Sequence, residues 1–140
     1  MNTPTAIDVI TVVPMTRTHA TSESPYEPAI GFSRAVRVDS VVAVSGTAPV
    51  WPDGEVDPDP TAQARRCWQI ALGALAELGG RPEDVLRTRQ YVVSADLADA
   101  VGAVHGQIFG DVRPASTMIV VAGLLDPRWL CEVELDALLP

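Results

Sequence analysis

The chain has 140 residues, 47% of them hydrophobic, and this length suits one domain that buries roughly two thirds of the surface its unfolded form exposes. With 18 acidic and 10 basic residues the formal net charge is −8, and the basic residues are scattered along the sequence. Phosphate-rich and anionic surfaces would repel such a chain, so we expect no nucleic-acid partner and no membrane partner.

The first thirty residues are rich in Pro, Thr and Ser, and we expect an N-terminal arm at 1–30 before one domain at 31–140. A β-branched run at 7–13 predicts a short strand within the arm. Alternating valines on both sides of Asp39 and Ser40 predict a β-hairpin with a tight turn. Residues 49–60 hold four prolines and four acids, which predicts a surface loop.

Two amphipathic helices follow from apolar spacings of three and four. Asp59 can cap the first and Pro60 can start it, and Gly79 and Gly80 can end it. The second has an apolar stripe from Leu97 to Ile108, with Gly110 placed to stop it. Three further strands are predicted at 86–93, 115–122 and 130–139. On the first of these, Arg87, Arg89 and Tyr91 should share one face, and Thr88, Gln90 and Val92 the other.

Two helices can cover only one face of a sheet with five or six strands. Residues 119–122 are apolar in both alternating registers, as expected for a strand buried on both sides. We therefore expect a homo-oligomer in which sheet faces meet around a common core. Small-molecule sites should lie where its subunits join.

The sequence carries no metal pattern and no targeting signal. Cys67 and Cys131 are far apart, which favours reduced packing residues, and His19 and His105 stand alone. Residues 1–6 lack the features of a signal peptide, and no run approaches 18 apolar residues. We expect a cytoplasmic protein without a metal site.

Five short motifs occur in a characteristic order. They are Val44-Ser45-Gly46, the helix from Gln63, the strand Arg87–Val93, Pro114-Ala115-Ser116-Thr117, and Val133-Glu134-Leu135-Asp136-Ala137. Together they resemble the reactive intermediate deaminase family (RidA, formerly YjgF). The resemblance implies an α+β, chorismate-mutase-like fold with a mixed sheet and two helices on one face. It also implies a homotrimer with a pocket at each subunit interface.

Archetypal members of that family hydrolyse enamines and imines without a cofactor. An arginine clamps the substrate carboxylate, and a glutamate holds the attacking water. In this chain Ser45 and Glu134 match pocket positions. Ser116 stands where the arginine belongs, Ser33 where a tyrosine is usual, and Gly102 where an asparagine is usual. A charge-assisted hydrogen bond contributes roughly 1.5–3 kcal/mol, so a substrate without a carboxylate, or one anchored differently, is expected.

Other residues could complete such a pocket. His105 could act as an acid or base, or it could simply pack. Arg34 or Arg113 could supply a replacement guanidinium, or either could be a surface charge. The hydroxyls of Ser116 and Thr117 suit binding more than attack, because the sequence shows no His–Asp pair beside them. Glu134 itself could instead belong to a solvated strand face.

Two functions stay open from the sequence. The first is an enzyme that hydrolyses an enamine, imine or related reactive metabolite by water addition assisted by Glu134. The alternative is a non-catalytic trimer that binds a small molecule as a sensor or protective partner. The ribonuclease activity sometimes ascribed to the family is disfavoured by the net charge of −8.

Overall fold

The computed structural model describes residues 15–140, so the predicted strand at 7–13 lies outside the described part of the chain. Its elements, in chain order, are β1 (Arg17–Ala20), α1 (Tyr26–Ile30), β2 (Ala35–Val38), β3 (Val41–Thr47), α2 (Pro60–Glu77), η1 (Pro82–Asp84), β4 (Val85–Val92), η2 (Ala95–Leu97), α3 (Ala98–Phe109), β5 (Ala115–Val120) and β6 (Cys131–Leu138).

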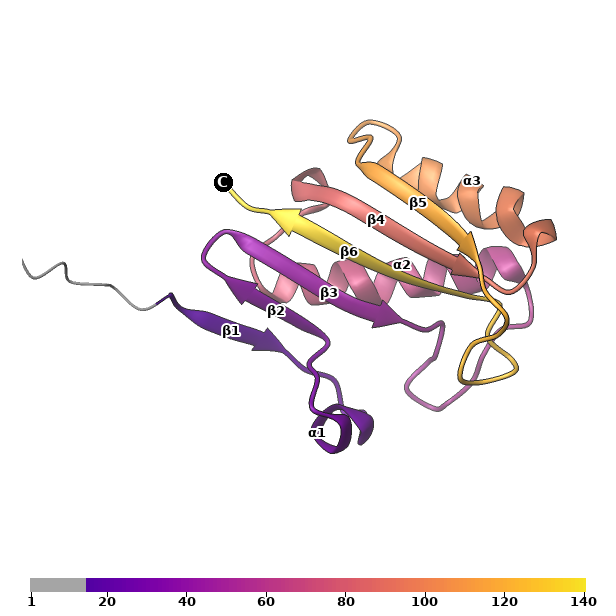
Figure 1. Ribbon diagram of the computed structural model, residues 1–140, viewed down its shortest axis with the longest axis horizontal. Coiled ribbons are helices and arrows are strands. Elements are labelled where there is room, and N and C mark those ends of the chain that lie inside the picture. Colours follow the sequence, from indigo (N-terminus) through magenta and orange to yellow (C-terminus); the bar gives the residue numbers. More distant parts are fainter. Residues whose placement is uncertain (1–14) are drawn as a thin grey trace, which may run out of the picture.

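The six strands form one mixed sheet in the order β1-β2-β3-β6-β4-β5 (Figure 1). Neighbouring strands are antiparallel except β4 and β5, which are parallel and are connected through α3. The hairpin of β2 and β3 turns at Asp39 and Ser40, as predicted, with φ of 51° at Asp39. The last strand, β6, lies between β3 and β4 and joins the two halves of the sheet.

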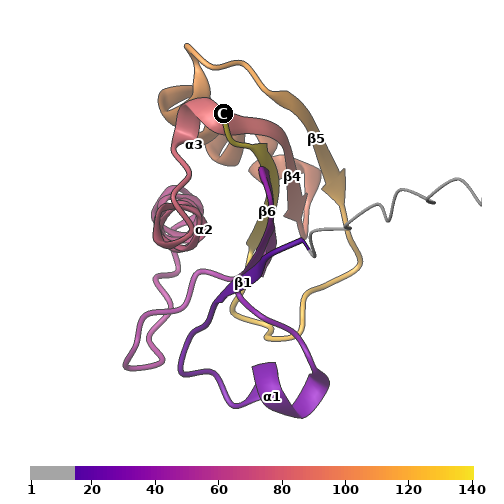
Figure 2. The same cartoon turned by 90° about the vertical axis from the view of Figure 1, so that its left-hand side faces the viewer.

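Both long helices cover the same face of this sheet, which confirms the expected α+β architecture (Figure 2). The first, α2, begins where the sequence indicates: the Asp59 carboxylate accepts a hydrogen bond from the amide of Ala62 at 2.9 Å, and Pro60 is the first helical residue. It ends at Glu77, and Gly79, whose φ of 90° needs the conformational freedom of glycine, turns the chain away just beyond.

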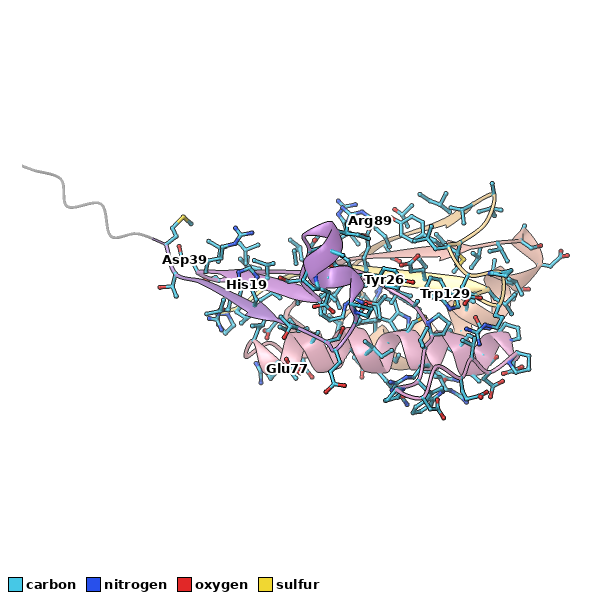
Figure 3. The ribbon with its side chains drawn as sticks, turned by 90° about the horizontal axis from the view of Figure 1, so that it is seen from below. His19, Tyr26, Asp39, Glu77, Arg89 and Trp129 are labelled. Atoms are coloured by element: carbon cyan, nitrogen blue, oxygen red, sulfur yellow. The ribbon has the colours of Figure 1, made fainter. Side chains whose placement is uncertain are left out.

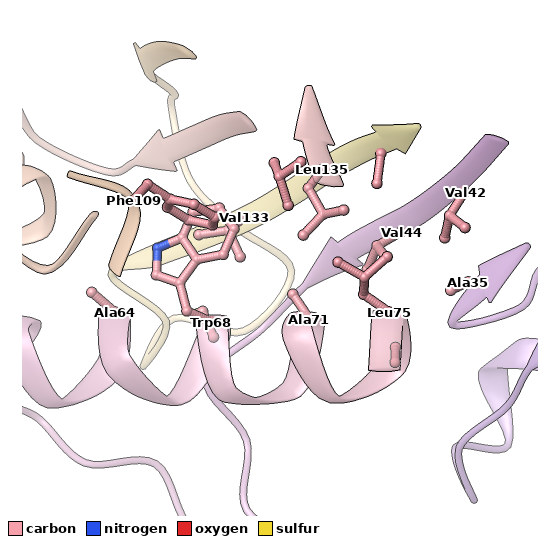
Figure 4. Close-up of a cluster of buried hydrophobic side chains, with 14 of the residues drawn as sticks. Ala35, Val42, Val44, Ala64, Trp68, Ala71, Leu75, Phe109, Val133 and Leu135 are labelled. Carbon is pink, nitrogen blue, oxygen red and sulfur yellow. The ribbon is translucent and has the colours of Figure 1, made fainter. Parts of the chain in front are cut away.

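The core lies between the helices and the sheet (Figure 4). Its largest fully buried side chains include Trp68 of α2, Phe109 of α3 and Leu135 of β6. Cys67 and Cys131 are free, fully buried thiols with their sulfur atoms 4.0 Å apart, which confirms that they pack in the core. The hydrogen bond to Cys131 and burial both raise the pKa of the Cys67 thiol.

Two elements occur inside the expected arm. The strand β1 pairs with β2 at the edge of the sheet, although its sequence, Arg-Thr-His-Ala, has no apolar alternation. Its neighbour α1 is a five-residue helix that ends at Gly31. Both arise from tertiary pairing and a local turn, which periodicity does not reveal. Within residues 15–140, no helix combines the length and apolarity that crossing a membrane requires.

Candidate functional site

The sheet face turned away from α2 and α3 is polar at its centre, and we call it the outer face. On β6 the alternation buries Val133 and Leu135 against the helices and leaves Glu132, Glu134 and Asp136 half-buried on the outer face. On β4 the prediction is confirmed: the residues paired with Asp136, Glu134 and Glu132 of β6 are Arg87, Arg89 and Tyr91. Figure 3 shows Arg89 on the side of the sheet opposite Glu77 of α2.

Glu134 is held from one side only. The Tyr91 hydroxyl donates a hydrogen bond of 2.5 Å to Oε1 of Glu134, and Nη1 of Arg89 lies 3.8 Å from the same oxygen. Nη1 of Arg89 also donates to Asp136 at 3.1 Å. The bond to Glu134 raises the pKa of Tyr91, so the phenol remains a donor at neutral pH. No partner of Oε2 is found among the described residues.

A β-bulge sets Ser45 opposite Glu134. The register pairs Val44 with Leu135 and Thr47 with Val133, so two residues of β3, Ser45 and Gly46, face the single residue Glu134. The Ser45 hydroxyl donates to the carbonyl of Ser33 at 2.6 Å, and the Ser33 hydroxyl lies 2.8 Å from Nδ1 of His19. The segment before β2 and the bulge therefore fix each other beside Glu134.

Arg34 brings a guanidinium to the same place. Its Nη2 donates to the carbonyl of Gly46 at 2.6 Å, whereas its buried Nε has no partner within residues 15–140. Burial lowers the pKa of Arg34, and the nearby carboxylates of Glu27 and Glu132 oppose that shift. Burial in turn raises the pKa of Glu132, with Arg34 opposing. We call Glu134, Tyr91, Arg89, Ser45, Ser33, Arg34 and Glu132 the outer-face cluster.

A second polar group lies on the helix side of the sheet. Thr88, fully buried on β4, donates a hydrogen bond of 2.8 Å to the hydroxyl of Ser116 on β5. Its oxygen also lies 2.8 Å from Nε2 of His105 on α3. We call Ser116, Thr88 and His105 the hydroxyl–imidazole row. Its Ser116 end is exposed.

Aromatic rings and glycines shape the surroundings of this row. The His105 ring packs against both Phe109 and Trp68, with ring centroids 4.7 and 5.7 Å away, and those two rings also contact each other. Burial lowers the pKa of His105, so its imidazole is uncharged at neutral pH. A Cβ at Gly106 would meet no atom within 4 Å, and one at Gly102 would meet only Cε of Met118, at 3.8 Å. The surface of α3 beside His105 is therefore open.

One chain does not bring all the predicted residues together. Ser116 pairs with Thr88 and Thr117 with Arg89, so the two hydroxyls point to opposite faces, and only Thr117 shares the face of Glu134. Ser116, Gly102 and His105 lie on the helix side. Arg113 is exposed just before β5 with a φ of 52°, and its side chain makes no hydrogen bond to another described residue.

Sequence reasoning missed the partners that hold the predicted residues. Tyr91, Arg89 and Thr88 were assigned to the correct faces but to no site. The alternation of β4 gave a usable signal, because it placed Tyr91 and Arg89 on one face. Which residue of β6 they meet depends on the strand register, which sequence alone does not provide. The described residues contain no group of three His, Cys, Asp or Glu side chains suited to a metal ion.

Comparison of the sequence with known families gives a match over nearly all of the described chain. A family model described as Endoribonuclease L-PSP matches residues 21–139. The chain is 40% identical over 119 residues to the uncharacterized protein SCO2049 of Streptomyces coelicolor, which covers 83% of this chain and 87% of that protein. It is also 27% identical to a RutC family protein of Pyrococcus abyssi, over 74% of this chain and 83% of the relative.

Two of the solved structures that share the fold of this chain have sequence identities close to those of the two relatives above. The crystal structure of Rv2704 from Mycobacterium tuberculosis, described as a member of the YjgF/YER057c/UK114 family, matches with a TM-score of 0.82 and 39% identity. That match covers 89% of this chain and 100% of the other. A putative endoribonuclease of Thermotoga maritima matches with a TM-score of 0.75 and 27% identity, over 87% and 92% of the two chains.

Proposed function

Because this chain belongs to the RidA/YjgF family, whose family model is described as Endoribonuclease L-PSP, we propose that it is a homotrimer that hydrolyses an enamine, an imine or a related reactive metabolite. The observation that carries the proposal is the one-sided restraint of Glu134. Tyr91 occupies Oε1, so the carboxylate is oriented while Oε2 stays available to a water molecule.

The chemistry follows from that geometry. A water held by Oε2 of Glu134 adds to the imine carbon and gives one proton to the carboxylate, while the C=N electron pair moves to nitrogen and takes that proton back from the carboxyl group. The hydroxyl of the resulting carbinolamine then gives its proton to the carboxylate, which passes it to the nitrogen, so the C–N bond breaks, the carbonyl forms and ammonia leaves. The reaction consumes one water, and the residues of this site need no redox partner for it.

The two polar groups of the chain would meet across a subunit interface. The outer-face cluster lies at the centre of the sheet, whereas the hydroxyl–imidazole row opens at β5, the edge strand. A trimer would bring the β5 edge of one subunit to the outer face of the next. This arrangement explains why Ser116 and Glu134 need not share a face within one chain.

The substrate anchor must differ from the family's arginine. Ser116 carries no charge. Of the two guanidinium groups in the outer-face cluster, Arg89 is paired with Asp136, whereas Arg34 donates to the carbonyl of Gly46 beside Ser45. We propose that the substrate either lacks a carboxylate or directs it to Arg34. Arg113 is a less suitable anchor because its exposed side chain makes no hydrogen bond or ion pair with another residue among 15–140.

The test is ammonia release from freshly generated 2-iminobutyrate and from a panel of imines with and without a carboxylate. We expect Glu134→Gln to lower kcat by about 100-fold or more, because it removes the base but keeps the shape. Glu77→Gln is the matched control, since Glu77 is exposed on α2 at the far side of the sheet. If no imine is turned over, or if Glu134→Gln keeps full activity, the proposal is wrong.

A non-catalytic trimer that binds a small molecule is the second candidate, and the replacements at Ser116, Ser33 and Gly102 favour it. It predicts stabilisation by a ligand without turnover, about 2.7 kcal/mol at a hundred times the dissociation constant. A thermal-shift screen of metabolites measures this effect. Ribonuclease activity remains disfavoured by the net charge of −8.

A further inference from the structure

The hydroxyl–imidazole row contains three polar side chains in hydrogen-bond contact and no formal charge. Thr88 is fully buried between the other two, and both of its bonds of 2.8 Å are partly buried. A buried hydroxyl that serves two partners fixes their positions, because breaking either bond would leave Thr88 unsatisfied. The exposed Ser116 hydroxyl is therefore a positioned group on the edge strand.

The hydrogen bonds of the hydroxyl–imidazole row can be arranged with donors and acceptors in either of two directions. When Thr88 donates to Ser116, as its geometry indicates, Nε2–H of His105 donates to Thr88, and the Ser116 proton is free for an acceptor on a ligand. In the reverse order, Ser116 accepts from a ligand N–H or O–H and donates through Thr88 to the Nε2 lone pair. Linked hydrogen bonds of this kind strengthen one another by roughly 10–30% per bond.

The row has no charge to offer a carboxylate. Burial keeps the His105 imidazole uncharged at neutral pH, and Ser116 and Thr88 are neutral. A carboxylate placed there would lose its water without gaining a cation. An amide or other neutral carbonyl loses less on desolvation and offers both an acceptor and a donor.

Space for such a group exists beside the row. Gly102 and Gly106 lie four residues apart on α3, on either side of His105 in sequence, and neither leaves a crowded surface. Met118, two residues after Ser116 on the same strand face, supplies an apolar contact. A group bound beside Ser116 could therefore contact the hydroxyl–imidazole row on one side and the apolar side chain of Met118 on the other.

We propose that the hydroxyl–imidazole row is a binding subsite for an uncharged amide or carbonyl group of the substrate, contacted through Ser116. Thr88 and His105 are positioning residues, because they act through Ser116. The inference rests on the proposed function in one respect: it assumes that the hydroxyl–imidazole row belongs to the substrate pocket. Binding measurements test it without any turnover.

The experiment compares 2-oxobutanamide with 2-oxobutyrate, two probes that differ only in amide against carboxylate. We expect the wild-type protein, titrated by calorimetry or ligand-observed NMR, to bind the amide at least ten-fold more tightly. Ser116→Ala and Thr88→Val should weaken amide binding at least five-fold, and Thr88→Ser should restore it because it keeps the hydroxyl. Ser116→Arg should reverse the preference in favour of the carboxylate.

Ser40→Ala is the matched control, because it removes a serine hydroxyl from the β2–β3 turn, in the half of the sheet away from β5, and it should leave the preference unchanged. Equal binding of the two probes, tighter carboxylate binding, or no detectable binding of either would overturn the subsite. So would a Ser116→Ala protein that keeps the wild-type preference. An amide preference without ammonia release from any imine would leave the subsite intact and overturn only the proposed hydrolysis.

Discussion

At the residue scale, Glu134 and Glu132 of β6 make different contacts. Glu134 makes a hydrogen bond to Tyr91, whereas Glu132 lies over Gly46, where a Cβ would come 2.9 Å from its Oε1. Gly46 therefore gives Glu132 its place beside Arg34. Asp136, the third acid on this face of β6, is half-buried and is paired with Arg89 at 3.1 Å.

Glu132 supplies a prediction on pH. Burial raises its pKa in the folded protein above the ordinary value of 4.5, so ionisation of Glu132 destabilises the fold as the pH rises through the raised pKa. We expect Glu132→Gln to raise the urea midpoint at pH 8 and to have little effect near pH 4, where the Glu132 carboxyl of the wild-type protein is mostly protonated and therefore as uncharged as glutamine. Glu77→Gln should show no such dependence. A wild-type protein that is more stable than Glu132→Gln at pH 8 would contradict the assignment.

At the scale of elements, local sequence signals define the helix α2, whereas pairing between distant strands defines the bulge in β3. The helix α2 has its cap, first residue and terminal glycines within its own sequence, and its bounds were predictable. The bulge in β3 has no such local signal, because it exists only against β6. It nevertheless sets Ser45 opposite Glu134, so the element that shapes the site is the one that sequence reasoning could not resolve.

The cap of α2 gives a stability prediction. Asp59→Ala removes the acceptor of the Ala62 amide and should lower the free energy of unfolding by about 1 kcal/mol, within the roughly 0.5–2 kcal/mol usual for such caps. Urea denaturation monitored by circular dichroism measures the loss. Asp111→Ala, an exposed acid in the turn after α3, is the control and should change the midpoint little. Equal effects of the two substitutions would argue against the cap.

At the scale of the whole molecule, the sheet has one covered face and one open face. Both helices lie on one side, and the outer face exposes Val41, Ile119 and Leu138 at 53%, 45% and 54%. Paired positions place Val41 beside Leu138 and Ile119 beside Tyr91. Apolar side chains of this size on an open sheet face are consistent with the proposed trimer.

The assembly can be tested on that face. Ile119→Glu places a charge near Tyr91 and should shift the mass in light scattering from about three times 14.9 kDa toward that of one chain. Leu125→Glu is the control, because Leu125 is 95% exposed in a loop outside the sheet. Activity should fall with the mass if the pocket needs two subunits. A monomeric wild-type protein would contradict the proposed assembly.

The sequence by itself determined the strands and the two long helices from residue 35 onward, the face of each residue on β4, and the family, but not the short helices η1 and η2. The features that it determined follow from local periodicity, caps and short motifs. Only the tertiary structure decided the strand order, the bulge opposite Glu134, the pairing of β1, and the separation of Ser116 from Glu134 by the sheet. The physical reason is that strand register depends on contacts between distant segments, and a shift by one residue turns every side chain to the other face.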